Sequence, residues 1–80
     1  MSKNVWITGA SSGIGKATAI KFANEGWQVA VSARRKELLE ELSKENSNIS
    51  SFPLDVTNRK LCVEVFQNIL KKYSNVDLCI

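Results

Sequence analysis

Glycines and serines are concentrated in one short segment that could bind a phosphate group, Thr8-Gly9-Ala10-Ser11-Ser12-Gly13-Ile14-Gly15. An apolar run precedes this segment and a helical pattern follows it. Its backbone N–H groups would therefore lie at a helix N-terminus, where the helix dipole favours negative charge. Glycines also let the backbone turn sharply and approach a phosphate without a Cβ in the way. We predict a diphosphate-binding loop shaped by Gly9, Gly13 and Gly15, with a purely structural turn as the alternative.

Two other glycine-rich phosphate loops fit this segment poorly. A nucleoside-triphosphate loop of the form G-x-x-x-x-G-K-[ST] would place Ala10 at its first glycine and Ala17 at its final hydroxyl residue. The common dinucleotide pattern G-x-G-x-x-G would begin at Gly13 and place Thr18 at its third glycine. The pattern that fits without a mismatch is T-G-x-x-x-G-x-G. A phosphotransferase is therefore disfavoured.

The elements that would position this loop alternate along the chain. Short apolar runs predict strands at residues 5–7, 28–32, 49–54 and 76–80. Helical spacing predicts helices at residues 14–25, 34–45 and 57–73, the first with Ile14, Ala17, Ile20 and Ala23 at that spacing and the last capped by Thr57. Gly26 can end the first helix. The order β-α-β-α-β-α-β predicts an α/β domain with helices on both faces of a parallel sheet.

Composition disfavours several classes of function. The chain has 80 residues, enough for one small domain, with a net charge of +3, two cysteines and no histidine. Without histidine or a CxxC pair we expect no metal site, and we expect no disulfide between Cys62 and Cys79. The basic residues form no stripe, so we expect no nucleic-acid partner. The first apolar run ends at Thr8, too early for a signal peptide or a membrane span, which predicts a cytoplasmic location.

Three segments together resemble the cofactor-binding half of the short-chain dehydrogenase/reductase family. They are the loop TGASSGIG, Ser32-Ala33-Arg34-Arg35 at the end of the second strand, and Leu54-Asp55-Val56-Thr57 after the third. The resemblance covers all 80 residues in order. It implies that residues 1–80 are the amino-terminal portion of an NAD(P)-binding, Rossmann-like three-layer α/β/α domain. It also implies that the loop glycines and the N–H of Ile14 meet the pyrophosphate, and that Ser11 and Ser12 reach the adenosine ribose or its phosphate.

The residue after the second strand indicates which cofactor is bound. Relatives that prefer NAD usually carry an acidic residue there, which bonds the ribose hydroxyls, whereas this chain has the neutral Ala33. Arg34 resembles the family's basic residue for the 2′-phosphate, and Arg35 would assist it. We therefore predict NADP(H), with NAD as the less favoured cofactor and solvated arginines as the alternative. Ser12 departs from the second basic residue that many NADP-preferring relatives carry in the loop.

Asp55 and Val56 resemble the family's adenine clamp. The Asp55 carboxylate would accept a hydrogen bond from the adenine amino group, and the backbone of Val56 would meet the ring. A second role for Asp55, in capping the following helix, is compatible with the first.

The family's catalytic residues have no counterpart in this chain. In family order the serine, the tyrosine and the lysine four residues after it lie beyond Ile80. Tyr73 is followed four residues later by Asp77 and is placed like a core residue. We predict the NADP(H)-binding half of an oxidoreductase that transfers hydride to or from a carbonyl or alcohol, in a parent chain that continues past Ile80 and forms homo-oligomers. A non-catalytic dinucleotide-binding module or sensor is the alternative.

Overall fold

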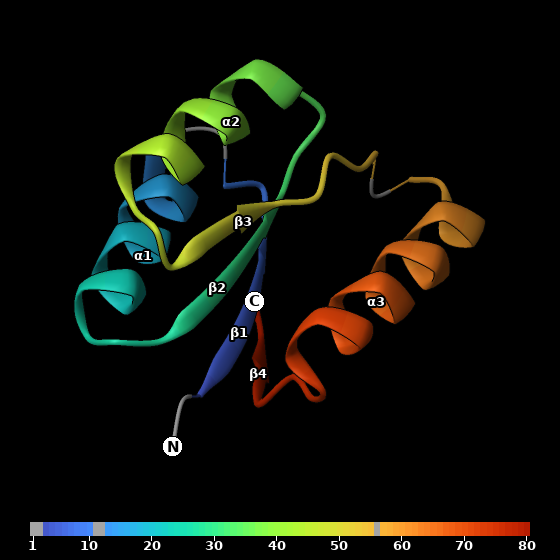
Figure 1. The fold of residues 1–80 in the computed structure, drawn as a ribbon. Coiled ribbons are helices and arrows are strands. Elements are labelled where there is room, and N and C mark those ends of the chain that lie inside the picture. The colour runs from blue at the N-terminus through green and yellow to red at the C-terminus, as the bar shows by residue number, and fades with distance from the viewer. Residues whose placement is uncertain (1–2, 11–12, 56) are drawn as a thin grey trace.

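The computed structural model describes residues 3–10, 13–55 and 57–80. Strands and helices alternate along this part of the chain (Figure 1): β1 (Asn4–Thr8), α1 (Gly13–Asn24), β2 (Gln28–Ser32), α2 (Lys36–Glu45), β3 (Ile49–Ser51), α3 (Arg59–Tyr73) and β4 (Leu78–Cys79). The strands pair in parallel, in the order β3-β2-β1-β4. The predicted three-layer α/β/α fold is confirmed.

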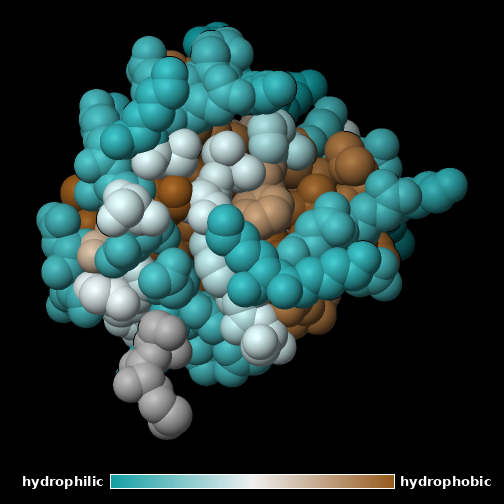
Figure 2. Space-filling view, in the orientation of Figure 1, coloured by the Kyte–Doolittle hydropathy of each residue, from teal (hydrophilic) through white to brown (hydrophobic). Residues whose placement is uncertain are grey.

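Successive side chains of a strand point to opposite faces of the sheet, so the hydrophobic core has two parts, one on each face. Val5 and Ile7 of β1 pack with residues of α1 and α2 on one face of the sheet. Trp6, between them in sequence, points to the other face and packs with Val65 and Ile69 of α3. In Figure 1, α1 and α2 accordingly lie together on one side of the sheet and α3 lies on the other. Figure 2 shows hydrophobic surface where α3 meets the sheet and hydrophilic surface over the outer sides of the helices.

Helix α1 packs on the sheet through small side chains. Ala19 and Ala23 are its buried residues, whereas Ile14 is 87% exposed and Ala17 is also exposed. The spacing had predicted that Ile14, Ala17 and Ala23 all face the sheet. This prediction is correct for Ala23 and wrong for Ile14 and Ala17. The physical reason is that this helix carries alanine and isoleucine around much of its circumference, so its periodicity is weak. Gly26 follows the helix with a φ of +91°, the left-handed conformation expected there.

Several element boundaries differ from the predicted ones. Helix α2 begins at Lys36, so Arg34 precedes the helix and Arg35 is its N-cap. Strand β3 ends at Ser51, whereas the predicted strand ran to residue 54 and included Pro53. It is an edge strand of the sheet. The cap of α3 is Asn58, whose side chain accepts a hydrogen bond from the N–H of Leu61 at 3.1 Å. The prediction that Thr57 caps this helix is wrong, because its hydroxyl is bonded elsewhere.

The amino ends of β1 and β4 are tied together by the buried side chain of Asn4. Its Nδ2 donates to the carbonyl oxygens of Tyr73 (3.2 Å) and Asn75 (3.0 Å). The N–H of Asn4 donates to Oδ2 of Asp77 at 2.8 Å. The hydroxyl of Tyr73 donates to the carbonyl of Val29 at 3.3 Å, and burial raises the pKa of this half-buried phenol. Tyr73 therefore holds the end of α3 against the sheet, as expected of a core residue.

Candidate cofactor-binding site

The strand order reverses direction at β1. The chain runs outward from β1 through β2 to β3, and then returns to place β4 on the other side of β1. Ligands of open parallel sheets bind outside the carboxyl ends of the strands, where the order reverses in this way. The glycine loop follows the carboxyl end of β1, and Arg34 and Asp55 follow β2 and β3. The fold therefore brings the three predicted cofactor segments to the same edge.

Within the loop, Gly9 and Gly13 adopt backbone conformations that favour glycine. Their φ angles are +68° and +59°, and a Cβ added at either residue would meet no atom of the described residues within 4 Å. Within that part of the chain, nothing blocks a diphosphate from approaching these two glycines. This conformation fits the cofactor that the loop sequence implies.

Gly15 is required for a different reason, namely close packing. A Cβ on Gly15 would overlap the carbonyl oxygen of Gly9 and would lie 2.9 Å from its carbonyl carbon and 3.1 Å from Cα of Ala10. These are backbone atoms, which cannot move aside as a flexible side chain could. Gly15 therefore lets the first turn of α1 lie directly against the loop.

The first turn of α1 has the features of a helix start that binds an anion. Ile14 is 87% exposed, and its N–H is one of the first four of the helix, which have no intrahelical carbonyl partner. No acidic residue lies in this first turn. The positive end of the helix dipole therefore lies next to the glycine loop, and no acidic residue of the first turn offsets it.

Ser32 attaches the loop to the end of β2, a role that the sequence analysis missed. Its carbonyl accepts a hydrogen bond from the N–H of Ala10 at 3.3 Å. Its buried hydroxyl accepts one from Nε1 of Trp6 at 2.9 Å. The sequence held a signal for the second contact, because a tryptophan in a buried strand needs an acceptor for its indole N–H.

Arg34 and Asp55 come together although they lie far apart in sequence. The N–H of Phe52 donates to the carbonyl of Val31 at 2.8 Å, and the N–H of Leu54 donates to that of Ala33 at 3.0 Å. Backbone pairing thus continues beyond the end of β3 and sets the following residues side by side. Nε of Arg34 lies 3.7 Å from Oδ2 of Asp55, with 80% and 41% of the two side chains exposed.

The carboxylate of Asp55 is also bonded within its own turn. Its Oδ1 accepts hydrogen bonds from the hydroxyl of Thr57 at 2.7 Å and from the N–H of Thr57 at 3.0 Å. The hydroxyl bond and then the N–H bond from Thr57 lower the pKa of Asp55, and desolvation opposes them. The charge of Arg34 also lowers this pKa and is the smallest of these contributions. Such turns are typical of an aspartate two residues before a threonine, a signal that the sequence contained.

The remaining predicted residues divide into two groups. Arg35 is exposed at the N-cap of α2 and makes no side-chain capping bond. Ser11, Ser12 and Val56 lie outside the described residues. Lys36, the next basic residue, forms an ion pair within α2, in which its Nζ lies 3.8 Å from Oε1 of Glu40.

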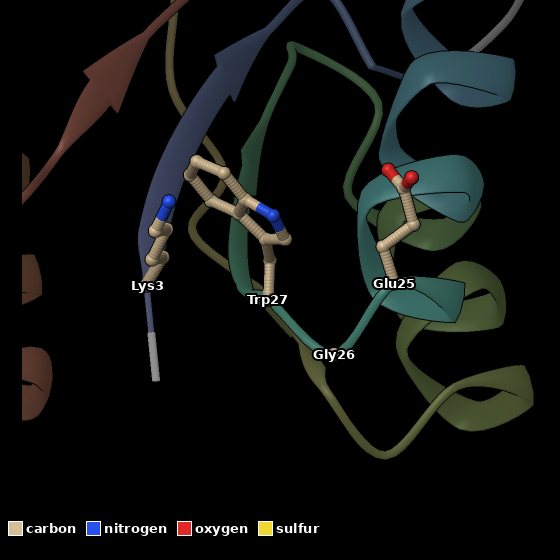
Figure 3. Close-up of a pocket in the computed structure, with 4 residues that line it drawn as sticks. All are labelled: Lys3, Glu25, Gly26 and Trp27. Carbon is tan, nitrogen blue, oxygen red and sulfur yellow. The ribbon is translucent and has the colours of Figure 1, made fainter. Parts of the chain in front are cut away.

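A hollow of about 270 Å³ lies at the opposite end of the molecule, next to the start of β1 and the end of α1. It is lined by Lys3, Glu25, Gly26 and Trp27 (Figure 3). The Nζ of Lys3 lies 5.6 Å from the centroid of the Trp27 ring, and Glu25 extends from the helix end on the other side of that ring. This hollow is at the amino ends of the strands and belongs to no predicted cofactor contact.

Some other kinds of site are not found within residues 3–10, 13–55 and 57–80. No cluster of three histidine, cysteine or acidic side chains there could hold a metal ion. Cys62 and Cys79 form no disulfide. None of the helices in this part of the chain combines the length and the apolar character that crossing a membrane requires.

Comparison with known proteins matches this architecture to one family. The family model described as short chain dehydrogenase matches residues 3–80. Over 78 residues the chain is 40% identical to a 3-oxoacyl-[acyl-carrier-protein] reductase of Thermotoga maritima, covering 92% of this chain and 32% of the relative. It is 34% identical over 77 residues to an NADP-dependent 3-hydroxy acid dehydrogenase of Shigella flexneri, covering 95% of this chain and 31% of that protein.

A solved structure shows the same fold. It is the 3-ketoacyl-(acyl-carrier-protein) reductase of Brucella melitensis complexed with NADH, which superposes with a TM-score of 0.92 at 28% identity. The match covers 96% of this chain and 32% of that one. The chain thus spans about a third of the length of the relatives that it matches.

Proposed function

The chain belongs to the short chain dehydrogenase family, and from this premise we propose that it is the cofactor-binding part of an oxidoreductase that uses NADP(H). The cofactor would supply hydride exchange with a carbonyl or alcohol substrate. Gly9, Gly13 and the N–H of Ile14 would hold its diphosphate, and Asp55 would hold its adenine. The catalytic acid, base and substrate-orienting groups would lie in sequence beyond Ile80.

The observation that carries the preference for NADP(H) is the environment at the end of β2. Ala33 is buried, 6% exposed, and offers no carboxylate to the ribose hydroxyls. Arg34 follows it with 80% of its side chain exposed at the same edge as the glycine loop. A cation that follows a neutral residue, at the position where an acid would bind the ribose hydroxyls, suits a 2′-phosphate better than a 2′-hydroxyl. Arg35, also exposed, would assist.

The relatives support binding of a dinucleotide cofactor and include both NADP and NADH among their cofactors. The proposed preference for NADP(H) therefore rests on this chain's own residues. One relative is named as NADP-dependent, and one matched structure contains NADH. The discriminating residue is therefore Arg34.

Cofactor binding by the full-length protein tests this proposal. NADPH should bind more tightly than NADH, and Arg34→Ala should remove most of that difference while leaving the affinity for NADH nearly unchanged. Loss of a charge-assisted phosphate contact should cost about 1.5–3 kcal/mol of binding free energy. Lys44→Ala, which removes one positive charge at the far end of α2, is the matched control. An unchanged NADPH-to-NADH ratio in Arg34→Ala would refute the assignment.

The roles of Ser11, Ser12 and Val56 in cofactor binding stay predictions. So do the cytoplasmic location, the carbonyl or alcohol substrate and the homo-oligomeric state of the parent protein.

A further inference from the structure

The two oxygens of the Asp55 carboxylate have different partners. Oδ1 accepts the two hydrogen bonds from Thr57, at 2.7 Å from the hydroxyl and 3.0 Å from the N–H. Oδ2 is left to face Nε of Arg34 at 3.7 Å. Because Oδ1 is bonded twice to one residue, the orientation of the carboxylate is restricted, and so is the direction in which Oδ2 points.

The contact engages only the side of the guanidinium group. It is made through Nε, and within the described part of the chain the terminal nitrogens Nη1 and Nη2 have no hydrogen-bond partner or ion pair. An arginine that is held at Nε still offers two parallel N–H groups at its end. Such a pair matches two oxygens of a phosphate.

An ion pair that favours one orientation of Arg34 would have an energetic consequence for binding. An exposed arginine samples many rotamers, and binding a phosphate must select one of them at an entropic cost. A side chain that is already restricted near its bound orientation loses less entropy on binding, which strengthens affinity without any new ligand contact. The backbone bond from the Leu54 N–H to the Ala33 carbonyl, 3.0 Å long, keeps the two segments in register for this purpose.

We propose that Asp55 is a positioning residue for Arg34, held in place by Thr57, and that it thereby contributes to the discrimination of the 2′-phosphate of NADPH from the 2′-hydroxyl of NADH. This inference rests on the proposed function. An aspartate is ionised at neutral pH, and the hydrogen bonds from Thr57 lower the pKa of Asp55 further, so its carboxylate carries the charge that pairing with Arg34 requires.

This role is separable from that of an adenine clamp. A hydrogen bond from Asp55 to adenine would contribute equally to NADPH and NADH, because both carry the same base. Orientation of Arg34 contributes only to NADPH. The ratio of the two dissociation constants therefore reports the positioning role, and the common change in both reports the clamp.

The first test is substitution of Thr57, which keeps the charge of Asp55. Thr57→Val removes the hydroxyl bond to Oδ1 at an exposed position, and Thr57→Ser keeps that hydroxyl. Binding of NADPH and NADH is measured by titration calorimetry on the full-length protein. We expect the preference for NADPH to fall roughly two- to fivefold in Thr57→Val, the scale of an exposed ion pair, and to be retained in Thr57→Ser. Equal preference in the three proteins would overturn the inference.

The second test is Asp55→Asn, with Glu64→Gln as a matched control. Glu64 is exposed on α3, so its substitution removes the same charge away from the site. We expect the preference for NADPH to fall in Asp55→Asn and to stay constant in Glu64→Gln. A rise in Asp55→Asn would show that the carboxylate merely repels the phosphate, and an equal loss of both affinities would show a clamp alone. Either result overturns the inference.

Arg34→Ala separates this inference from the proposed function. If that substitution leaves the cofactor preference unchanged, the assignment of NADP(H) fails. If it abolishes the preference while the Asp55 and Thr57 variants leave it intact, only the positioning role fails.

Discussion

The indole Nε1 of Trp6 donates a buried hydrogen bond to the hydroxyl of Ser32 at 2.9 Å. The two residues lie on neighbouring parallel strands, and the carbonyl of Ser32 also accepts the N–H of Ala10 in the glycine loop. One small polar residue therefore links the core on the α3 side of the sheet to the segment that would bind the diphosphate.

Ser32→Ala should destabilise the fold. The substitution leaves the Trp6 N–H without an acceptor at a residue that is only 8% exposed, and an unpaired buried donor costs about 1–3 kcal/mol. The free energy of unfolding in urea, followed by circular dichroism, measures this loss. In a Trp6→Phe background the donor is absent, so the same substitution should cost much less. An equal cost in both backgrounds would contradict the role given to this hydrogen bond.

Gly15→Ala should impair both stability and cofactor binding. The added Cβ meets backbone atoms of Gly9 and Ala10 that cannot yield without reshaping the loop, and overpacking of this kind costs about 1–3 kcal/mol or more. Gly26→Ala is the control, because Gly26 has a positive φ with open space around it and lies away from the cofactor edge. It should lower stability and leave the dissociation constant of NADPH unchanged. Normal binding by Gly15→Ala would show that the loop does not need this close packing.

Asn58→Ala should weaken α3 at its start. The Asn58 side chain accepts the N–H of Leu61, and loss of such an N-cap costs about 0.5–2 kcal/mol. Thermal unfolding compared with Asn58→Asp, which keeps an acceptor at the same position, measures the effect. Similar unfolding temperatures for Asn58→Ala and Asn58→Asp would show that the side chain of residue 58 does not stabilise the start of α3.

The carboxyl group of Asp55 should titrate below the ordinary value of 3.8. Because the Thr57 bonds and the charge of Arg34 lower its pKa in the folded state, the stabilisation is fully present above that ordinary value. It is lost as the pH falls through the lower folded pKa. The carboxyl carbon shift, followed by NMR against pH, gives the folded pKa directly. Thr57→Val should move it back toward the ordinary value, and an unchanged pKa in that variant would exclude the hydroxyl as its main cause.

The order of the elements was predictable because each strand reads as a compact apolar run. Val5-Trp6-Ile7 is buried on both faces of the sheet and contains no polar residue, which is typical of a central parallel strand. The turn at Gly9 and Gly13 was predictable as well, since glycine is the residue that readily adopts the positive φ found at both. The sequence pattern did not predict which residues of α1 are buried. Small alanines, rather than Ile14, pack against the sheet there.

The contact between Arg34 and Asp55 could not be predicted from sequence. Each residue was assigned a separate part of the cofactor, and their proximity depends on the register of β2 with β3 and on backbone pairing that continues to Leu54. Register of this kind arises from the packed sheet and leaves no local trace in either segment. The N-cap of α3 was predicted to be Thr57 and is Asn58 for a similar reason, because the side chains of both residues can accept hydrogen bonds and only the backbone geometry chooses between them.

The position of β1 between β2 and β4 has a consequence for how the sheet forms during synthesis. On one side β1 pairs with the strand that follows α1, while on the other it pairs with Leu78 and Cys79, and its N–H at Asn4 bonds a side chain 73 residues away. A ribosome therefore releases the first strand long before its second neighbour exists. Until then the nascent chain presents one side of β1 as an open, apolar strand edge, the kind of surface that chaperones shield and that unfinished chains use to associate.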